Sequence, residues 1–180
     1  MNKDIVKFIT RTAVLLALTV LFQSLRSFIP MPPQVGQYVV GSLVNLSLIV
    51  AAVLVGIKGG LAISIAAPII AYFQGQLPPI MPFMIVAVAL GNAAIVVMVG
   101  LLYNKNKYAA LISGAVLKFI TLYVVVIKIV LPFIYPNAPE QAKALLSVNF
   151  SWPQLVTASI GGLLSLFVIP LVSKALQVDN

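Results

Sequence analysis

The sequence contains no cysteine and no histidine. The absence of cysteine excludes disulfides, thiolate catalysis and metal sites that need a thiolate ligand. The absence of histidine removes the most common metal ligand of proteins and their most common general base. We therefore predict neither a metal site nor a cofactor for this protein.

Acidic residues are scarce as well, and none is expected where it could act inside a membrane. Asp4, Glu140 and Asp179 all fall outside the apolar runs of the chain. Ion-coupled transporters usually need a buried carboxylate to carry a proton or bind sodium, and hydrolytic sites are built largely from acids, histidine or cysteine. We therefore expect neither a self-sufficient ion-coupled transporter nor an enzyme. The halves 1–90 and 91–180 share no pattern, so an inverted-repeat transporter is not indicated either.

The chain is instead dominated by apolar residues. They make up 62% of 180 positions, which is more apolar surface than a soluble domain of this size can hide from water. Most of the apolar runs approach the ~20 residues that a membrane-spanning helix needs. The six runs are residues 5–28, 38–55, 60–74, 82–103, 108–134 and 153–174. The pattern predicts an all-α, multi-pass membrane protein with about six transmembrane helices and a single domain over residues 1–180.

Basic residues are distributed unevenly between the two sides that six alternating runs define. One side has only Arg26 and Lys143. The other side carries Lys3, Lys7, Arg11, Lys58, Lys105, Lys107 and Lys174. Because cytoplasmic loops are enriched in lysine and arginine, we predict that both termini are cytoplasmic. The net charge of +8 is spread among the loops, so the expected partner is the lipid bilayer and not a nucleic acid.

The outer connections differ from the short inner ones in length and composition. They are rich in proline and contain Gln, Asn, Tyr and Trp, and they cover residues 30–38, 74–79 and 132–153. Loops on a rigid scaffold are where binding groups usually sit. This favours Gln37, Tyr38 and Trp152 as ligand contacts, although the two aromatic residues could equally belong to an interfacial aromatic belt.

Lys118 is the most costly residue of the chain because it lies in the middle of an apolar run. At ~1.5 Å per residue from Tyr108 it is roughly 15 Å deep, where a lysine costs ~3 kcal/mol to insert. Thr121 and Lys128 follow at helical spacing, which predicts a cationic stripe from mid-membrane toward the outside. Lys128 could simply reach the outer headgroups, whereas Lys118 is harder to explain in that way.

Two further polar residues are candidates for the same site. Asn92, which follows Gly91 on an apolar run, is either a ligand contact or an interhelical hydrogen bond. Arg26 is expected near the outer surface, where it could bind an anionic ligand or a lipid headgroup. Asn45 and Gln23 are also polar at membrane depth.

Ala13 and Ala17 form a small-residue pair four positions apart on the first run. Such a pair makes a flat stripe against which another helix can pack closely.

Together these features resemble the substrate-binding subunit, or S component, of an energy-coupling factor (ECF) vitamin transporter. The resemblance covers essentially the whole chain: about 180 residues, six helices, a basic N-terminal arm, the Ala13-x-x-x-Ala17 motif and the segment PMPPQVGQYVVGSLVNLSLIVAAVLVGIKGG. It implies a subunit of the bacterial plasma membrane that binds a vitamin-like molecule from outside. It also implies delivery inward by toppling, together with a transmembrane T component and two ATPases, and the chain itself has no nucleotide-binding motif.

The same resemblance assigns Ala13 and Ala17 to the contact with the T component. It places the ligand in the outer half, between the runs 82–103, 108–134 and 153–174 and the outer connections.

The expected charge of the ligand follows from the predicted pocket region. This region contains three basic residues, Arg26, Lys118 and Lys128, and a single acidic one, Glu140. This excess of positive charge favours an anionic ligand such as pantothenate, nicotinate, a biotin-like or a folate-like compound over cationic thiamine. The alternative is a stand-alone membrane protein, either a small facilitator or an assembly factor, whose apolar helices are purely structural.

Overall fold

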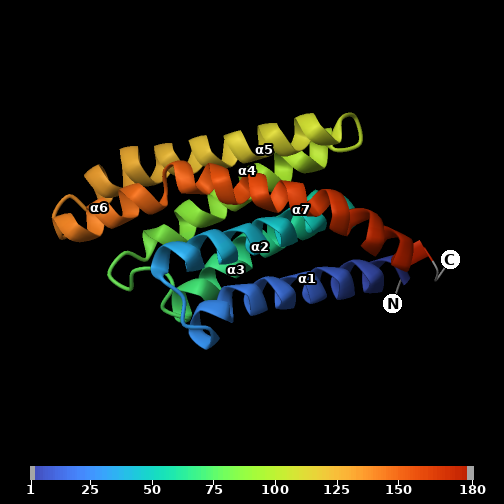
Figure 1. The fold of residues 1–180 in the computed structure, drawn as a ribbon, viewed down its shortest axis with the longest axis horizontal. Coiled ribbons are helices and arrows are strands. Elements are labelled where there is room, and N and C mark those ends of the chain that lie inside the picture. Colours follow the sequence, from blue (N-terminus) through green and yellow to red (C-terminus); the bar gives the residue numbers. More distant parts are fainter. Residues whose placement is uncertain (1–2, 178–180) are drawn as a thin grey trace.

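The computed structural model describes residues 3–177, which form helices and short connections. Asp179 and Asn180 lie outside the described residues. The helices are α1 (Lys3–Phe28), α2 (Pro33–Leu54), α3 (Ile57–Phe73), α4 (Phe83–Leu102), α5 (Lys107–Leu122) with its continuation η1 (Tyr123–Ile134), α6 (Glu140–Asn149) and α7 (Trp152–Gln177) (Figure 1). The all-α prediction with six apolar helices is confirmed.

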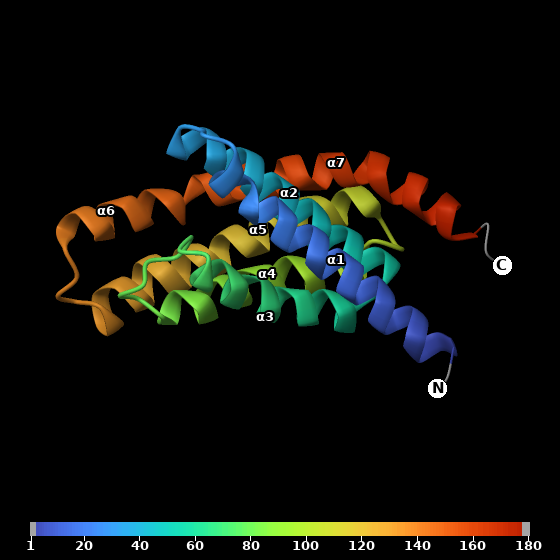
Figure 2. The ribbon, with the colours of Figure 1, turned by 90° about the horizontal axis from the view of Figure 1, so that it is seen from below.

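Length and composition fit a membrane-spanning bundle. Within residues 3–177, five helical segments are long and apolar enough to cross a bilayer, while α3 is shorter, with 17 residues. α1 begins and α7 ends at the same end of the bundle (Figures 1 and 2). This agrees with an even number of crossings, and the cytoplasmic orientation of that end remains a prediction.

The helices pack around α2 and α4. The most extensive contacts are those of α2 with α7 and of α4 with α5, and residues of α2, α3, α4 and α5 form most of the main hydrophobic core. α1 lies at the edge, and its only buried side chains are Thr19 and Gln23.

Two of the expected outer connections contain more helix than the sequence suggested. α2 begins at Pro33, because proline fits the first helical position, where no backbone donor is needed. Gln37 and Tyr38 therefore lie on a helix and not in a loop. The segment 132–153 is also mostly helical, since η1 runs to Ile134 and α6 occupies Glu140–Asn149.

The second half of the fifth run is a π-helix, in which hydrogen bonds join residues five apart. Its end shows this spacing, since the Tyr135 amide donates to the Val130 carbonyl oxygen at 3.0 Å. The wider turn changes the register of the helix face after Leu122. The prediction of a continuous cationic stripe from Lys118 to Lys128 is therefore wrong, because Lys118 is buried whereas Lys128 is exposed.

Candidate functional site

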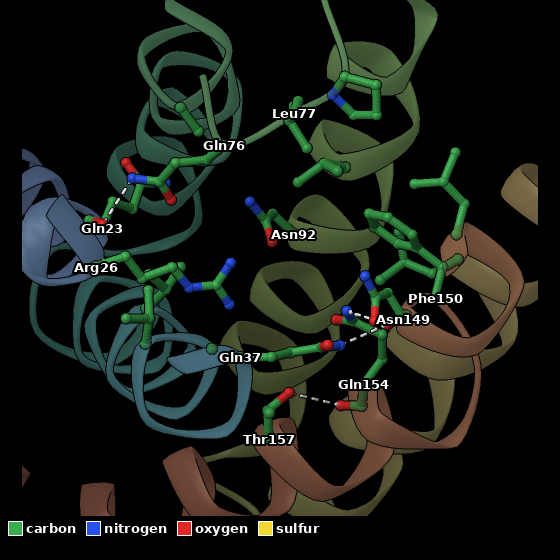
Figure 3. A pocket seen from close by; sticks show the side chains of 18 of the residues that line it. Gln23, Arg26, Gln37, Gln76, Leu77, Asn92, Asn149, Phe150, Gln154 and Thr157 are labelled. Carbon is green, nitrogen blue, oxygen red and sulfur yellow. Dashed lines mark hydrogen bonds between the residues drawn. The ribbon is translucent and has the colours of Figure 1, made fainter. Parts of the chain in front are cut away.

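A cavity of about 400 Å³ lies at the end of the bundle opposite to the start of α1 and the end of α7. α1, α2, α4, α5 and the junction of α6 with α7 line it, and the α3–α4 connection adds a further wall (Figure 3). Apolar side chains such as Leu77, Val88 and Phe150 alternate with amide and basic groups. A concave, largely apolar site with a few polar groups is typical of small-molecule binding.

Lys118 lines the cavity near the middle of the continuous helix 107–134 and is only 4% exposed. Its Nζ donates to Asn45 Oδ1 on α2 at 2.6 Å and to Asn92 Oδ1 on α4 at 2.8 Å. These short, charge-assisted bonds tie three helices together. An ammonium group has three donors, so one remains for which no described residue provides an acceptor.

The packing of α7 against α2 supports this cluster. Asn45 Nδ2 donates to Thr157 Oγ1 at 3.3 Å, and Thr157 in turn donates to the Gln154 carbonyl oxygen at 3.2 Å. α7 can approach this closely because residue 161 is glycine: a Cβ there would lie 2.8 Å from both Asn45 Cβ and the Ser42 carbonyl oxygen.

The second basic group of the cavity is Arg26, in the last turn of α1. Its side chain is exposed and points into the cavity (Figure 3), and no described residue forms a hydrogen bond or ion pair with it. Among the described residues that line the cavity, none is acidic. The two cations therefore create a positive potential without an internal counter-charge.

Amide hydrogen bonds fix the outer rim of the cavity. Gln76 Nε2 donates to the Gln23 carbonyl oxygen at 2.6 Å, and Gln74 Nε2 donates to Ser24 Oγ at 2.9 Å. These bonds attach the α3–α4 connection to α1. Gly75, between the two glutamines, has a φ of 72°, a left-handed conformation that favours glycine.

The structure brings together four of the eight residues that the sequence suggested for the ligand. Lys118, Asn92, Arg26 and Gln37 all line the cavity. Asn92 makes the interhelical hydrogen bond that was one of its two expected roles, and it also faces the cavity through its amide group (Figure 3).

The other four candidates do not line this cavity. The rings of Tyr38 and Trp152 pack together with centroids 6.0 Å apart. Lys128 lies over the Tyr123 ring, 5.7 Å from its centroid, and Thr121 is half-buried on α5. Their assignment as ligand contacts remains an untested prediction that the cavity does not support.

Several lining residues were not among the candidates. Asn45 and Gln23 were recognised only as polar residues at depth, and Gln76 only as part of a connection. Asn149 and Phe150 were missed because α6 was taken as a loop, whereas Gln154 and Thr157 lie in the predicted run 153–174 but were not singled out. A signal was present: Glu140 follows Pro139 at the start of a segment with Ala142, Leu145 and Leu146 at helical spacing.

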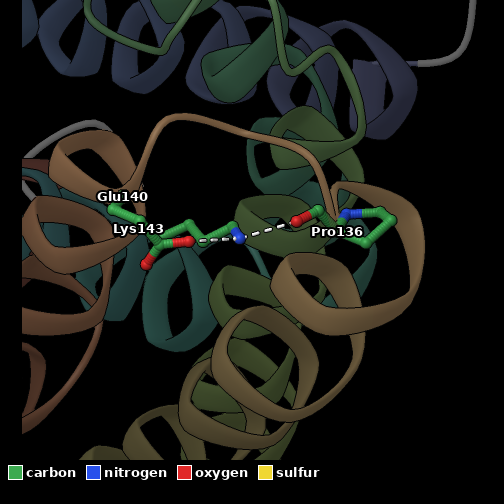
Figure 4. Close-up of polar contacts among 3 residues, drawn as sticks. All are labelled: Pro136, Glu140 and Lys143. Atoms are coloured by element: carbon green, nitrogen blue, oxygen red, sulfur yellow. Dashed lines mark hydrogen bonds and ion pairs between the residues drawn. The ribbon is translucent and has the colours of Figure 1, made fainter.

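Glu140, the only acid expected near the pocket, lies elsewhere. Its carboxylate pairs with Lys143 Nζ at 2.8 Å, and the same Nζ donates to the Pro136 carbonyl oxygen at 2.6 Å (Figure 4). This contact connects α6 to the segment before it and leaves the charge of the cavity uncompensated.

Ala13 and Ala17 are both exposed on α1. The pair therefore faces away from the bundle and is available to another helix, as a docking surface would require.

Comparison with known families gives one match. The family described as "ECF transporter, substrate-specific component" matches residues 7–173. Comparison with curated proteins and with solved structures finds no significant match.

Proposed function

The chain belongs to the substrate-specific components of ECF transporters, and we propose that it captures a small, anionic, vitamin-like molecule from outside the cell. A member of this family is a substrate-binding membrane subunit of a transporter and not an enzyme. In our proposal the ligand occupies the 400 Å³ cavity, and a T component with two ATPases then releases it into the cytoplasm.

The observation that carries this proposal is the presence of two basic residues, Arg26 and Lys118, in a cavity that no described acidic residue lines. A buried cation such as Lys118 is stabilised by an opposite charge nearby. Lys118 has only the amide oxygens of Asn45 and Asn92 as partners, and Arg26 has no described partner. An anionic ligand would supply the missing counter-charge, whereas a cationic ligand would add to the repulsion.

The size of the cavity supports a small metabolite. Sites for such molecules typically measure about 300–1,000 Å³, and this cavity lies at the lower end of that range. Its place in the bundle supports uptake from outside: if the basic connections are cytoplasmic, the opposite end, which contains the cavity, faces outward.

The exposed Ala13/Ala17 pair supports the proposed partners. Small residues allow close backbone approach between helices in a membrane, and α1 has one side free of contacts with the rest of the bundle. We propose that the T component packs there, in the plasma membrane of a bacterium.

Affinity purification of the tagged protein from its host membrane tests the proposed assembly. We expect a T component and two ATPase subunits to co-purify in stoichiometric amounts, and Ala17→Trp to abolish their recovery. Recovery of the protein alone from gently solubilised membranes that contain these subunits would contradict the proposal and favour a stand-alone facilitator.

A further inference from the structure

One backbone carbonyl in the break between α6 and α7 accepts hydrogen bonds from two glutamines. The Asn149 carbonyl oxygen receives Gln37 Nε2 from α2 and Gln154 Nε2 from α7, each at 2.9 Å. The orientation of both amides is fixed by this arrangement, because exchanging N and O in either would place two acceptors in contact.

The consequence is a pair of acceptors directed into the cavity. With both nitrogens committed to Asn149, the two Oε1 atoms point the other way, toward the side of the cavity from which Arg26 projects (Figure 3). No described residue donates a hydrogen bond to either oxygen. The cavity wall at this point therefore offers two acceptors, Gln37 Oε1 and Gln154 Oε1, that no described residue pairs.

Three groups elsewhere in the cavity are donors, although Gln23 Oε1, from the same helix as Arg26, is a buried acceptor without a partner among the described residues. Within residues 3–177, nothing accepts a hydrogen bond from the Arg26 guanidinium group or from the third donor of Lys118. Asn92 uses its oxygen to accept from Lys118, so its Nδ2 is left without an acceptor among the described residues. The cavity thus combines unpaired donors on Arg26, Lys118 and Asn92 with two unpaired acceptors on Gln37 and Gln154.

We infer that the ligand carries two kinds of group: an anionic group, such as a carboxylate, and at least one N–H or O–H donor. The anionic group lies against Arg26, Lys118 and Asn92, and the donor group hydrogen-bonds Gln37 and Gln154. This inference rests on the proposed function and narrows its substrate class to hydroxy-, amide- or ureido-bearing carboxylates. Gln37 and Gln154 are then the residues that determine specificity, because a bound ligand without the donor shields their oxygens from water and leaves them unpaired.

Three groups of probes test this directly by calorimetric titration of the purified protein in detergent. Pantothenate and biotin carry both a carboxylate and donor groups. Lipoate and nicotinate carry a carboxylate without such a donor, and pantothenyl alcohol and biotin amide carry donors without a carboxylate. We expect the tightest binding in the first group, by at least about 10-fold over either of the others.

Two variants separate recognition from a purely structural role. Gln37→Leu and Gln154→Leu each leave the other glutamine bonded to Asn149, so the junction of α6 with α7 keeps one of its two ties. Each should reduce the preference of the protein for the donor-bearing carboxylate over the donor-free one by about 10-fold. Gln34→Leu, an exposed glutamine of α2 that does not line the cavity, should leave that preference unchanged.

The outcomes distinguish the two proposals. Equal or tighter binding of lipoate or nicotinate, or an equal loss of all probes in the two variants, would overturn the assignment of Gln37 and Gln154 and leave anion capture intact. Tightest binding of the neutral probes, or binding by none of the six, would contradict the proposed function itself.

Discussion

Lys118 shows how a membrane bundle can hold a cation at depth without a buried acid. Two asparagine oxygens on neighbouring helices accept its hydrogen bonds, but amide dipoles do not neutralise a full charge. The free energy of the unliganded state is therefore higher than it would be with a counter-ion, and an anion entering the cavity gains the difference.

We predict that Lys118→Met weakens binding of the co-purifying small molecule at least about 30-fold. Removing one partner of a desolvated, charged hydrogen bond typically costs ~2–5 kcal/mol. The melting temperature without ligand should change little, because the loss of a buried charge offsets the loss of two hydrogen bonds to amides that line the cavity. Titration and thermal unfolding of the same preparation measure both quantities.

Lys128→Met is the matched control, since Lys128 is exposed on the same continuous helix. The affinity of this variant for the small molecule should stay within about 2-fold of the wild-type affinity, because water and lipid headgroups can replace the contacts of the lysine. A larger effect of Lys128→Met than of Lys118→Met would place the ligand outside the cavity.

At this scale the sequence identified the unusual residues but not their grouping. The cost of a lysine at membrane depth singled out Lys118, and polarity singled out Asn45 and Asn92. Which faces of α2, α4 and α5 meet depends on helix register and crossing, which a single sequence does not specify. For the same reason, the sequence could not show that the other four candidates lie outside the lining of this cavity.

At the scale of helices, the contact between α2 and α7 brings together Asn45 and Thr157, which both line the cavity. Gly161 lets the two backbones approach, whereas the neighbouring Gly162 faces α5, where a Cβ would lie 3.5 Å from Leu111 Cβ, an ordinary contact. The two glycines are adjacent on one helix but differ in what surrounds them.

We predict that Gly161→Ala lowers the melting temperature and the ligand affinity, because the added methyl group forces α7 away from Asn45. Overpacking of this kind costs about 1–3 kcal/mol. Gly162→Ala should be neutral or stabilising, since alanine favours a helix over glycine by about 1 kcal/mol. Equal behaviour of the two variants in thermal unfolding and titration would show that the approach of α2 and α7 is not limited at residue 161.

The Ala13/Ala17 stripe gives a prediction that separates docking from binding. Ala13→Trp or Ala17→Trp should abolish uptake into cells while the isolated protein binds its ligand normally, because both residues face away from the cavity. Leu18→Trp is the control, and it should leave uptake intact: Leu18 is also exposed, but it lies one position from Ala17 and five from Ala13 and so does not share their helix face. Loss of ligand binding in Ala13→Trp or Ala17→Trp would show that the stripe packs inside the fold.

Apolar periodicity and length predicted the long helices correctly, because burial in lipid imposes a strong and simple pattern. The same reasoning missed α6, which is short and has both polar and apolar residues, and it missed the π-helical turns of η1. Hydropathy is nearly identical for an α- and a π-helix, so the change of register after Leu122 had no signal in composition.

For the whole molecule, the asymmetry of basic residues predicts the orientation in the membrane. A single cysteine at Asn104 should react with a membrane-impermeant reagent only from the cytoplasm, and one at Asn137 only from outside. Both residues are exposed in connections at opposite ends, and the chain has no native cysteine. Asn104 is preferable to Asn106, whose side chain caps α5 by accepting from the Ala109 amide at 3.0 Å. Labelling of Asn104 from outside would reverse the topology.

The central claim is that the cavity captures an anionic molecule, and the identity of the molecule that stays bound during purification tests it most directly. The protein, released from its host membrane in mild detergent, would be analysed by native mass spectrometry and the ligand identified after denaturation. We expect one small carboxylate per chain, lost in Lys118→Met and retained in Lys128→Met. A bound cation such as thiamine, or a carboxylate retained equally by both variants, would contradict the claim.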